Sequence, residues 1–286
     1  MRQIVFLSGK GGTGKTTFSS SLVAFTSGAI AADCDVDGAN MQIALGGRVH
    51  REEEFFGMPR VAIDDSMCSR CGLCEELCQF DAIHPPEVKI EACEGCMVCL
   101  DHCPFHAIGE ISVPCGKWFV SSTEWGPLVH ARLDPGEENS GKLVNVVRTE
   151  AKRLCPEEGL IILDGPPGIG CPAISALTGC DLAVIVAEPS VSSLHDAERL
   201  LELVRQMRVK PVAVINKSDL SAELEGEISR FFEKRGVHIC GKLPFCKEVP
   251  QIQGSGRPPV AAISGGFSDK LRECCSEILK QVGTAI

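Results

Sequence analysis

The chain has 286 residues, a hydrophobic fraction of 44% and a formal net charge of −10. This length allows an α/β domain with one small insert. Most of the acidic excess falls between Arg60 and Glu110, which argues against binding to nucleic acid or to an anionic membrane. No apolar stretch is long enough to predict a transmembrane helix, and the start lacks the features of a secretory signal, so we expect a cytoplasmic protein.

Strand-like and helix-like segments alternate along the chain. Apolar runs typical of buried strands occur at residues 4–7, 29–32, 160–163, 182–187 and 212–215. Helical periodicity occurs at residues 15–25, 143–154, 194–207 and 267–282. The alternation predicts an α/β fold with a doubly wound, mostly parallel sheet. The last helix mixes acidic and basic residues, so we expect its apolar face to pack on the core rather than on a membrane.

A P-loop motif follows the first predicted strand and precedes the first predicted helix, as this motif requires. Its members and the threonine after it are Gly9, Lys10, Gly11, Gly12, Thr13, Gly14, Lys15, Thr16 and Thr17. Glycines allow backbone N–H groups to surround phosphates at the positive end of the helix. We expect Lys15 to reach the β- and γ-phosphates of a nucleotide and Thr16 to ligate Mg²⁺.

Carboxylates follow two other predicted strands. Asp164 ends the run 160–163, where a Walker B carboxylate holds Mg²⁺ directly or through water. Three aspartates follow the run 29–32, and we predict that Asp37 positions the attacking water, while Asp35 also suits a turn. Ligand loops of parallel sheets lie at the carboxyl ends of the strands, so both groups are expected beside the P-loop.

A polar segment that contains Asn216 and Asp219 follows the strand predicted at 212–215. An amide at this place can hydrogen-bond a purine base, and the same four-residue pattern binds guanine in GTPases. This motif alone therefore leaves ATP and GTP open. A simple polar turn is the alternative, because Asn and Asp favour turns in any case.

A cysteine-rich segment interrupts the α/β pattern between residues 60 and 112. It contains an internal repeat with an offset of 25 residues, in which Cys68, Cys71, Cys74 and Cys78 correspond to Cys93, Cys96, Cys99 and Cys103. We therefore predict a nucleotide-binding domain made of residues 1–59 and 113–286. Residues 60–112 are predicted to form a small inserted α+β domain of the bacterial ferredoxin type.

Both cysteine runs match the C-x₂-C-x₂-C-x₃-C pattern of two-cluster ferredoxins, in which the fourth ligand of each cluster comes from the other run. One [4Fe–4S] cluster is expected on Cys68, Cys71, Cys74 and Cys103. The other is expected on Cys93, Cys96, Cys99 and Cys78. Zinc also binds four cysteines, but it explains two runs with this spacing poorly.

Together these motifs resemble the MinD/Mrp/nitrogenase-iron-protein class of P-loop ATPases, whose deviant P-loop carries an additional lysine. Lys10 occupies that position, and residues 33–40 and 164–168 resemble the switch regions of the class. The resemblance implies a homodimer in which Lys10 reaches the nucleotide of the partner subunit, and it favours ATP.

Two functions fit this combination. An ATP-driven dimer could shift the cluster domain toward a protein redox partner, or the protein could deliver clusters to apo iron–sulfur acceptors, as assembly ATPases of the same class do. We predict electron transfer, because ferredoxin-type clusters are usually retained and no Cys-x-x-Cys pair lies outside the insert. A partitioning ATPase gives no reason for the clusters.

Two features stay open at this point. Cys171 follows the second switch-like segment, and it suits either a cluster bridged between subunits or a packed or free thiol. Residues 118–142 suggest loop and packing residues, with no chemistry assigned.

Overall fold

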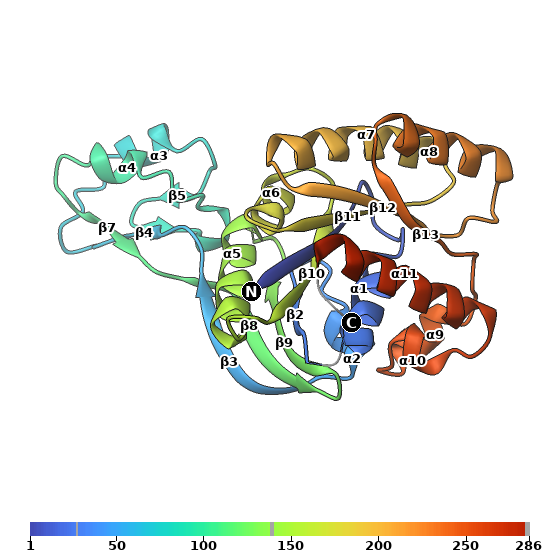
Figure 1. The fold of residues 1–286 in the computed structure, drawn as a ribbon. Helices are drawn as coiled ribbons and strands as arrows, with labels where there is room; N and C mark the ends of the chain where they lie inside the picture. The colour runs from blue at the N-terminus through green and yellow to red at the C-terminus, as the bar shows by residue number, and fades with distance from the viewer. Residues whose placement is uncertain (27, 138–139, 284–286) are drawn as a thin grey trace. The chain divides into compact units, whose positions relative to one another are not determined.

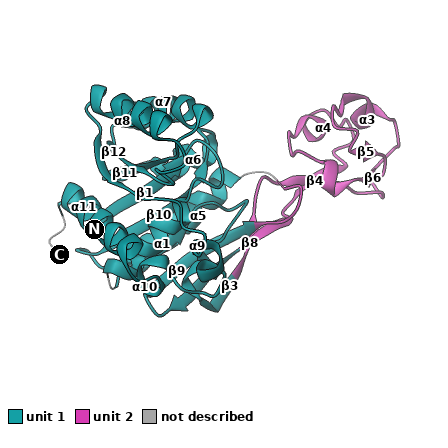
Figure 2. Cartoon of the chain, turned by 90° about the vertical axis from the view of Figure 1, so that its right-hand side faces the viewer, with its two compact units in different colours: residues 1–52, 118–132, 140–286 teal, residues 53–117, 133–139 magenta. Residues whose placement is uncertain are grey.

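The computed structural model describes residues 1–26, 28–137 and 140–283. The chain divides into two compact units, which Figure 2 shows in different colours. The larger unit contains residues 1–52, 118–132 and 140–286, and the smaller unit contains residues 53–117 and 133–139. The smaller unit thus extends beyond the insert limits of 60 and 112 expected from sequence, and it includes a second, later segment.

One sheet forms the centre of the larger unit (Figure 1). Among the described residues its strands are β1 (Arg2–Ser8), β2 (Ile30–Asp33), β3 (Arg48–Phe56), β8 (Pro114–Thr123), β9 (Gly126–Leu133), β10 (Leu160–Pro167), β11 (Leu182–Ala187), β12 (Lys210–Ile215) and β13 (His238–Lys242). Their spatial order is β13-β12-β11-β1-β10-β2-β9-β8-β3, and the neighbours from β13 to β9 pair in parallel. The prediction of a mostly parallel sheet is confirmed.

Helices cover both faces of this sheet (Figure 1). One face carries α1 (Lys15–Thr26), α2 (Met41–Leu45), α9 (Val249–Gly254), α10 (Pro259–Ala262) and α11 (Gly266–Val282). The other carries α5 (Ser140–Leu154), α6 (Cys171–Leu177), α7 (Val191–Gln206) and α8 (Ala222–Lys234). Leu271, Ile278 and Val282 of α11 lie in the main core, which confirms the predicted packing of this helix. Within the described residues, every helix is too short or too polar to cross a membrane.

Two helices of the second face begin at serine caps. The Ser190 hydroxyl accepts the backbone N–H of Ser193 at the start of α7 (3.2 Å), and Ser221 does the same for Leu224 in α8 (3.3 Å). An N-cap serine satisfies an N–H group that has no partner within the helix. This explains why α7 begins three residues before the point that apolar periodicity predicts.

Strands β8 and β9 form a hairpin in the region that had no assigned role. The expectation of a loop is wrong there, while the expectation of packing holds for Trp118 and His130, which are both buried. The guanidinium of Arg51 lies 4.6 Å from the ring centroid of Trp118, and His130 Nε2 is 2.9 Å from the Ser121 hydroxyl. Burial lowers the pKa of His130 to about 4, so this imidazole is neutral at physiological pH.

The smaller unit is built from short elements. They are β4 (Arg60–Ile63), α3 (Leu73–Leu77), β5 (Ile83–His84), β6 (Glu87–Val88), η1 (Ile90–Ala92), α4 (Val98–Asp101) and β7 (Ile108–Ile111). Strand β4 pairs antiparallel with β7, and β5 pairs antiparallel with β6. Its buried apolar core consists of Val61, Ala82, Ile83, Cys99 and Ile108. So small a core gives limited stability by itself.

The cysteine repeat is also a repeat of backbone conformation. Left-handed residues occur in pairs separated by the same 25-residue offset: Arg70 with Gly95, Gly72 with Met97, and Asp81 with His106. Two backbone hydrogen bonds obey the same symmetry, from Asp64 N to Ala107 O (2.7 Å) and from Lys89 N to Ala82 O (2.8 Å). The repeat identified from cysteine spacing is thus a duplicated structural unit.

The later segment of the smaller unit is joined to the earlier one by polar contacts. An Arg60 guanidinium nitrogen lies 2.6 Å from a Glu137 carboxylate oxygen, and both side chains are largely buried. The backbone N–H of Asp134 also donates to the carbonyl of Cys115 (3.1 Å). Both segments therefore belong to one packed unit.

A buried arginine connects two helices of the larger unit. Arg148 of α5 is 4% exposed, and it donates to the carbonyl oxygens of Ser175 and Thr178 near the end of α6. It also donates to Gln3 Oε1 (3.0 Å). These contacts satisfy carbonyl groups that a helix end leaves without partners.

We expect Arg148→Met to lower the free energy of unfolding by about 2–4 kcal/mol, because buried carbonyl groups lose charged donors. Urea denaturation followed by circular dichroism measures the change. Arg153→Met is the matched control on the same helix: its side chain is 67% exposed, and we expect a change within about 0.5 kcal/mol. Equal effects of the two substitutions would contradict this role of Arg148.

Candidate functional site

The carboxyl ends of five neighbouring parallel strands, β12, β11, β1, β10 and β2, carry the polar groups of the site. In register, Phe6 of β1 lies beside Asp164 of β10, and Asp164 lies beside Asp33 of β2. The P-loop follows β1, Glu188 follows β11 and Asn216 follows β12. Ligands of open α/β sheets bind at this edge, so the topology alone collects these residues.

The P-loop connects β1 to α1, and its residue Gly14 lies against the side chain of Asn216. Gly14 has a φ of +104°, and a Cβ atom there would lie 2.2 Å from Asn216 Nδ2, so this position requires glycine. Asn216 Nδ2 donates to the Thr13 carbonyl (2.8 Å), and Asp219 Oδ1 accepts the backbone N–H of Phe245 (2.6 Å). Asn216 thus holds the P-loop, and the predicted base contacts of Asn216 and Asp219 stay predictions.

Lys15 is a buried cation at the first residue of α1. Its side chain is 6% exposed; its Nζ donates to the Ser8 hydroxyl (3.2 Å) and lies 4.0 Å from Asp35 Oδ2. A buried ammonium requires charged or polar partners. The Ser8 hydroxyl carries no charge and Asp35 Oδ2 lies at the limit of contact. The Lys15 ammonium is therefore suited to bind a phosphate, as the P-loop pattern predicts.

The acidic groups beside Lys15 fit a magnesium ion. Asp164 Oδ2 accepts the Thr16 hydroxyl (2.6 Å), while Asp164 Oδ1 is buried without a hydrogen-bond partner among the described residues. Burial raises the pKa of Asp164 to about 6, and burial together with Asp164 raises that of Asp33 well above its usual range. A bound cation would favour the charged forms. Thr16 and Asp164 are therefore the residues that would hold Mg²⁺.

A cleft of about 760 Å³ opens beside these groups. Its lining includes Lys15, Thr16, Asp35, Asp37 and Asn216, so the structure brings these predicted site residues together. Thr17 lines the cleft as well, along with Gly11, Gly12 and Gly14. Phe245, a lining residue that sequence reasoning missed, is 52% exposed and adds an apolar surface.

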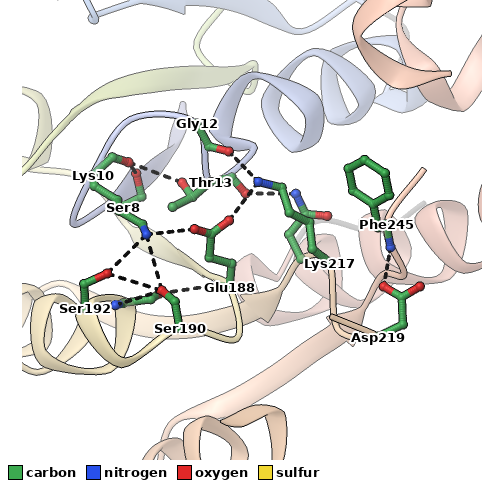
Figure 3. Close-up of polar contacts among 12 residues, drawn as sticks. Ser8, Lys10, Gly12, Thr13, Glu188, Ser190, Ser192, Lys217, Asp219 and Phe245 are labelled. Carbon is green, nitrogen blue, oxygen red and sulfur yellow. Dashed lines mark hydrogen bonds and ion pairs between the residues drawn. The ribbon is translucent and has the colours of Figure 1, made fainter. Parts of the chain in front are cut away.

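Lys10 forms contacts within its own chain (Figure 3). Its Nζ lies 2.9 Å from Glu188 Oε1 and donates to the hydroxyls of Ser190 (3.3 Å) and Ser192 (3.2 Å). Lys217 Nζ contacts the second oxygen, Glu188 Oε2, at 2.8 Å. Sequence reasoning missed Glu188 and Lys217, although Glu188 follows a buried strand as Asp164 does.

The eight predicted cluster ligands surround two small cavities of the smaller unit. One cavity is lined by the expected set Cys68, Cys71, Cys74 and Cys103, and also by Cys99. The other is lined by Cys78, Cys93, Cys96 and Cys99, which is the second expected set. No three Cys, His, Asp or Glu side chains of the described chain converge as ligands of a single metal ion. Thiolates placed around a cavity fit a cubane, which accepts one cysteine at each of four iron atoms.

The remaining cysteines divide between buried and accessible positions. Cys34 and Cys180 are buried, and burial raises the pKa of the Cys180 thiol to about 11. Cys171 is exposed at the first residue of α6. Its role as a bridging ligand stays a prediction.

Fold and site define a P-loop nucleotide-binding protein. A family model for the CobQ/CobB/MinD/ParA nucleotide-binding domain matches residues 4–260. This match covers most of the chain, so the protein belongs to the CobQ/CobB/MinD/ParA family.

Relatives and solved structures agree with this assignment. An uncharacterized protein of Methanocaldococcus jannaschii is 37% identical over 253 residues, which cover 87% of each chain. A protein of Pyrococcus abyssi named iron-sulfur cluster carrier protein is 25% identical over 278 residues, covering 90% of this chain and 79% of that protein. The structure of MinD with Mg-ADP from Pyrococcus horikoshii has a TM-score of 0.60 at 18% identity, covering 99% of this chain and 97% of that chain. That structure shows a shared fold.

We expect Asp164→Asn to weaken the contribution of Mg²⁺ to ATP binding, because an amide is a weaker ligand than a carboxylate. Titration with a fluorescent ATP analogue, once in Mg²⁺ and once in EDTA, measures the affinity with and without the metal. The Mg²⁺-dependent gain in affinity should fall by about tenfold, with affinity in EDTA little changed.

Asp181→Asn is the control for this substitution. Asp181 accepts the backbone N–H of Gln3 at the opposite end of the sheet (2.8 Å), and its loss should leave the effect of Mg²⁺ intact. An unchanged Mg²⁺ effect in Asp164→Asn would show that this carboxylate is not a metal ligand.

Proposed function

We propose that this protein is a Mg²⁺-dependent ATPase that acts as a homodimer and couples its nucleotide state to electron transfer through two [4Fe–4S] clusters. One observation carries the proposal: a P-loop site and two cavities, each lined by four cysteines of the expected set, occur in a single chain. The family supports nucleotide binding, and the cysteines support the clusters.

The hydrolytic part rests on groups around the cleft. Lys15 would bind the β- and γ-phosphates of ATP, and Thr16 and Asp164 would hold Mg²⁺. Asp37, which is exposed and lines the cleft, would position the attacking water. Lys10 would act in the partner subunit, as in the ATPases that this chain resembles.

The cluster part rests on the chemistry of the cysteines. When bound, the clusters would supply one-electron carriers. Burial raises the pKa of the Cys99 thiol to about 11 and also raises that of Cys74, so both thiols are protonated at neutral pH in the absence of metal. Iron must therefore displace protons, and we expect cluster binding to strengthen as pH rises.

The partner we propose is a protein with a basic surface. Two of the few cations of the smaller unit are already paired, Arg60 with Glu137 and Arg70 with Asp65. The remaining carboxylates would attract positive charge and repel nucleic acid. Cys71 and Cys96, one from each cysteine set, are exposed and place each cavity near the surface.

Cluster delivery is the second candidate, and one observation favours it: three relatives at 25–29% identity are named iron-sulfur cluster carrier proteins. In that case an apo iron–sulfur protein would be the partner and a cluster the cargo. The position of Cys99 in the core of the smaller unit favours retention, because release would disturb that core.

Anaerobically reconstituted chain should contain about eight iron atoms. Cys78→Ala should reduce this number toward four and affect the cluster whose other ligands come from the second run. Iron and sulfide analysis with electron paramagnetic resonance measures both effects. Cys155→Ala, in the larger unit, should leave the iron content unchanged. Protein that binds only zinc would contradict the assignment.

Electron transfer and cluster delivery differ in what leaves the protein: an electron in the first case and a whole cluster in the second. Electron transfer predicts that Mg-ATP accelerates oxidation of the dithionite-reduced protein by a basic electron acceptor, with iron retained. Cluster delivery predicts that iron moves to an apo-ferredoxin in the presence of a chelator. Equal oxidation rates with ATP and with ADP would count against coupling to nucleotide state.

A further inference from the structure

Glu188 links two lysines to one another beside the P-loop (Figure 3). One carboxylate oxygen contacts Lys10 Nζ at 2.9 Å, and the other contacts Lys217 Nζ at 2.8 Å. Lys217 Nζ also donates to the carbonyl of Gly12 (2.9 Å). The carboxylate is thus connected to the P-loop at both ends, through Lys10 directly and through Lys217 by way of Gly12.

The surroundings fix the position of Glu188. Its backbone N–H donates to the Ser193 hydroxyl (3.1 Å), and its side chain is 14% exposed. Burial alone would raise the pKa of Glu188, but hydrogen bonds from Lys217 and Lys10 outweigh it and keep the pKa below its usual value. The carboxylate is therefore charged at neutral pH.

Lys10 is the more exposed of the two lysines. Its side chain is 37% exposed, against 25% for Lys217, and its other contacts are two hydroxyls on the first turn of α7 and its N-cap. Because the Lys10 ammonium reaches solvent, this ion pair is weak enough to be exchanged for another partner of Lys10. When Lys10 leaves, Glu188 keeps Lys217 as its partner, so no carboxylate is left buried without a counter-charge.

We propose that Glu188 is a positioning residue that holds Lys10 on its own subunit and thereby sets the threshold for ATP-dependent pairing with a second copy of this chain. This inference rests on the proposed function, in which Lys10 binds the nucleotide of the partner. Pairing then exchanges the carboxylate of Glu188 for the more highly charged phosphates as the partner of Lys10.

Sedimentation velocity of the full, cluster-loaded chain with Mg²⁺ and a non-hydrolysable ATP analogue tests this. Glu188→Gln keeps the shape and removes the charge, so we expect the monomer–dimer dissociation constant to fall by about three- to tenfold. Glu225→Gln is the matched control: Glu225 is 19% exposed and pairs with Lys242 at 2.6 Å, away from the P-loop, and should behave as wild type. Lys217→Met shows how much of any change comes from the contact with Gly12.

The outcomes separate this inference from the proposed function. A dissociation constant for Glu188→Gln that equals or exceeds the wild-type value overturns the inference. If the wild type stays monomeric and the Glu188→Gln variant forms dimers, the inference stands, and Glu188 holds Lys10 more strongly than expected. If neither pairs, the inference fails, while Mg²⁺-dependent binding of the ATP analogue by the monomer independently reports whether the proposed nucleotide site exists.

Discussion

The parallel register of β1, β10 and β2 is the constraint on which the rest of the structure depends. It places Asp164 between the strand that leads into the P-loop and the strand that ends at Asp33. The hydrogen bond from Thr16 to Asp164 then ties the first turn of α1 to β10. A carboxylate that is almost completely buried and only half satisfied is unfavourable in isolation. It is tolerated because core packing on both faces of the sheet fixes its position, and such unsatisfied groups mark functional sites.

The smaller unit is inserted between two strands that take no part in the register of β1, β10 and β2. The chain leaves the large sheet after β3 and returns in β8, and these two strands are neighbours at the sheet edge. The parallel strands that build the nucleotide site lie on the other side of β9 in the sheet order. An insertion between adjacent edge strands requires no rearrangement of the central register, because its two ends already lie close together.

Local patterns predicted those parts of the fold that depend on local chemistry. Continuous apolar runs marked the buried strands, and the P-loop and Asp164 followed from their places after such strands. The hairpin of β8 and β9 was missed because Gly116 lies within β8 and Pro127 within β9, and both residue types weaken a strand pattern. The bridge at Glu188 was missed because it joins residues from three different strand ends, and no spacing along the chain encodes such a contact. The extra segment 133–139 was missed for the same reason, since the Arg60–Glu137 pair spans 77 residues.

The Arg60–Glu137 pair also bears on how such a module can be transplanted. A continuous fragment ending near residue 117 would include Arg60 but not Glu137. The Arg60 side chain, which is only 13% exposed, would then lose its counter-charge. The cysteine-bearing unit is therefore not a contiguous cassette. A functional graft into another host would have to carry two separate pieces of chain.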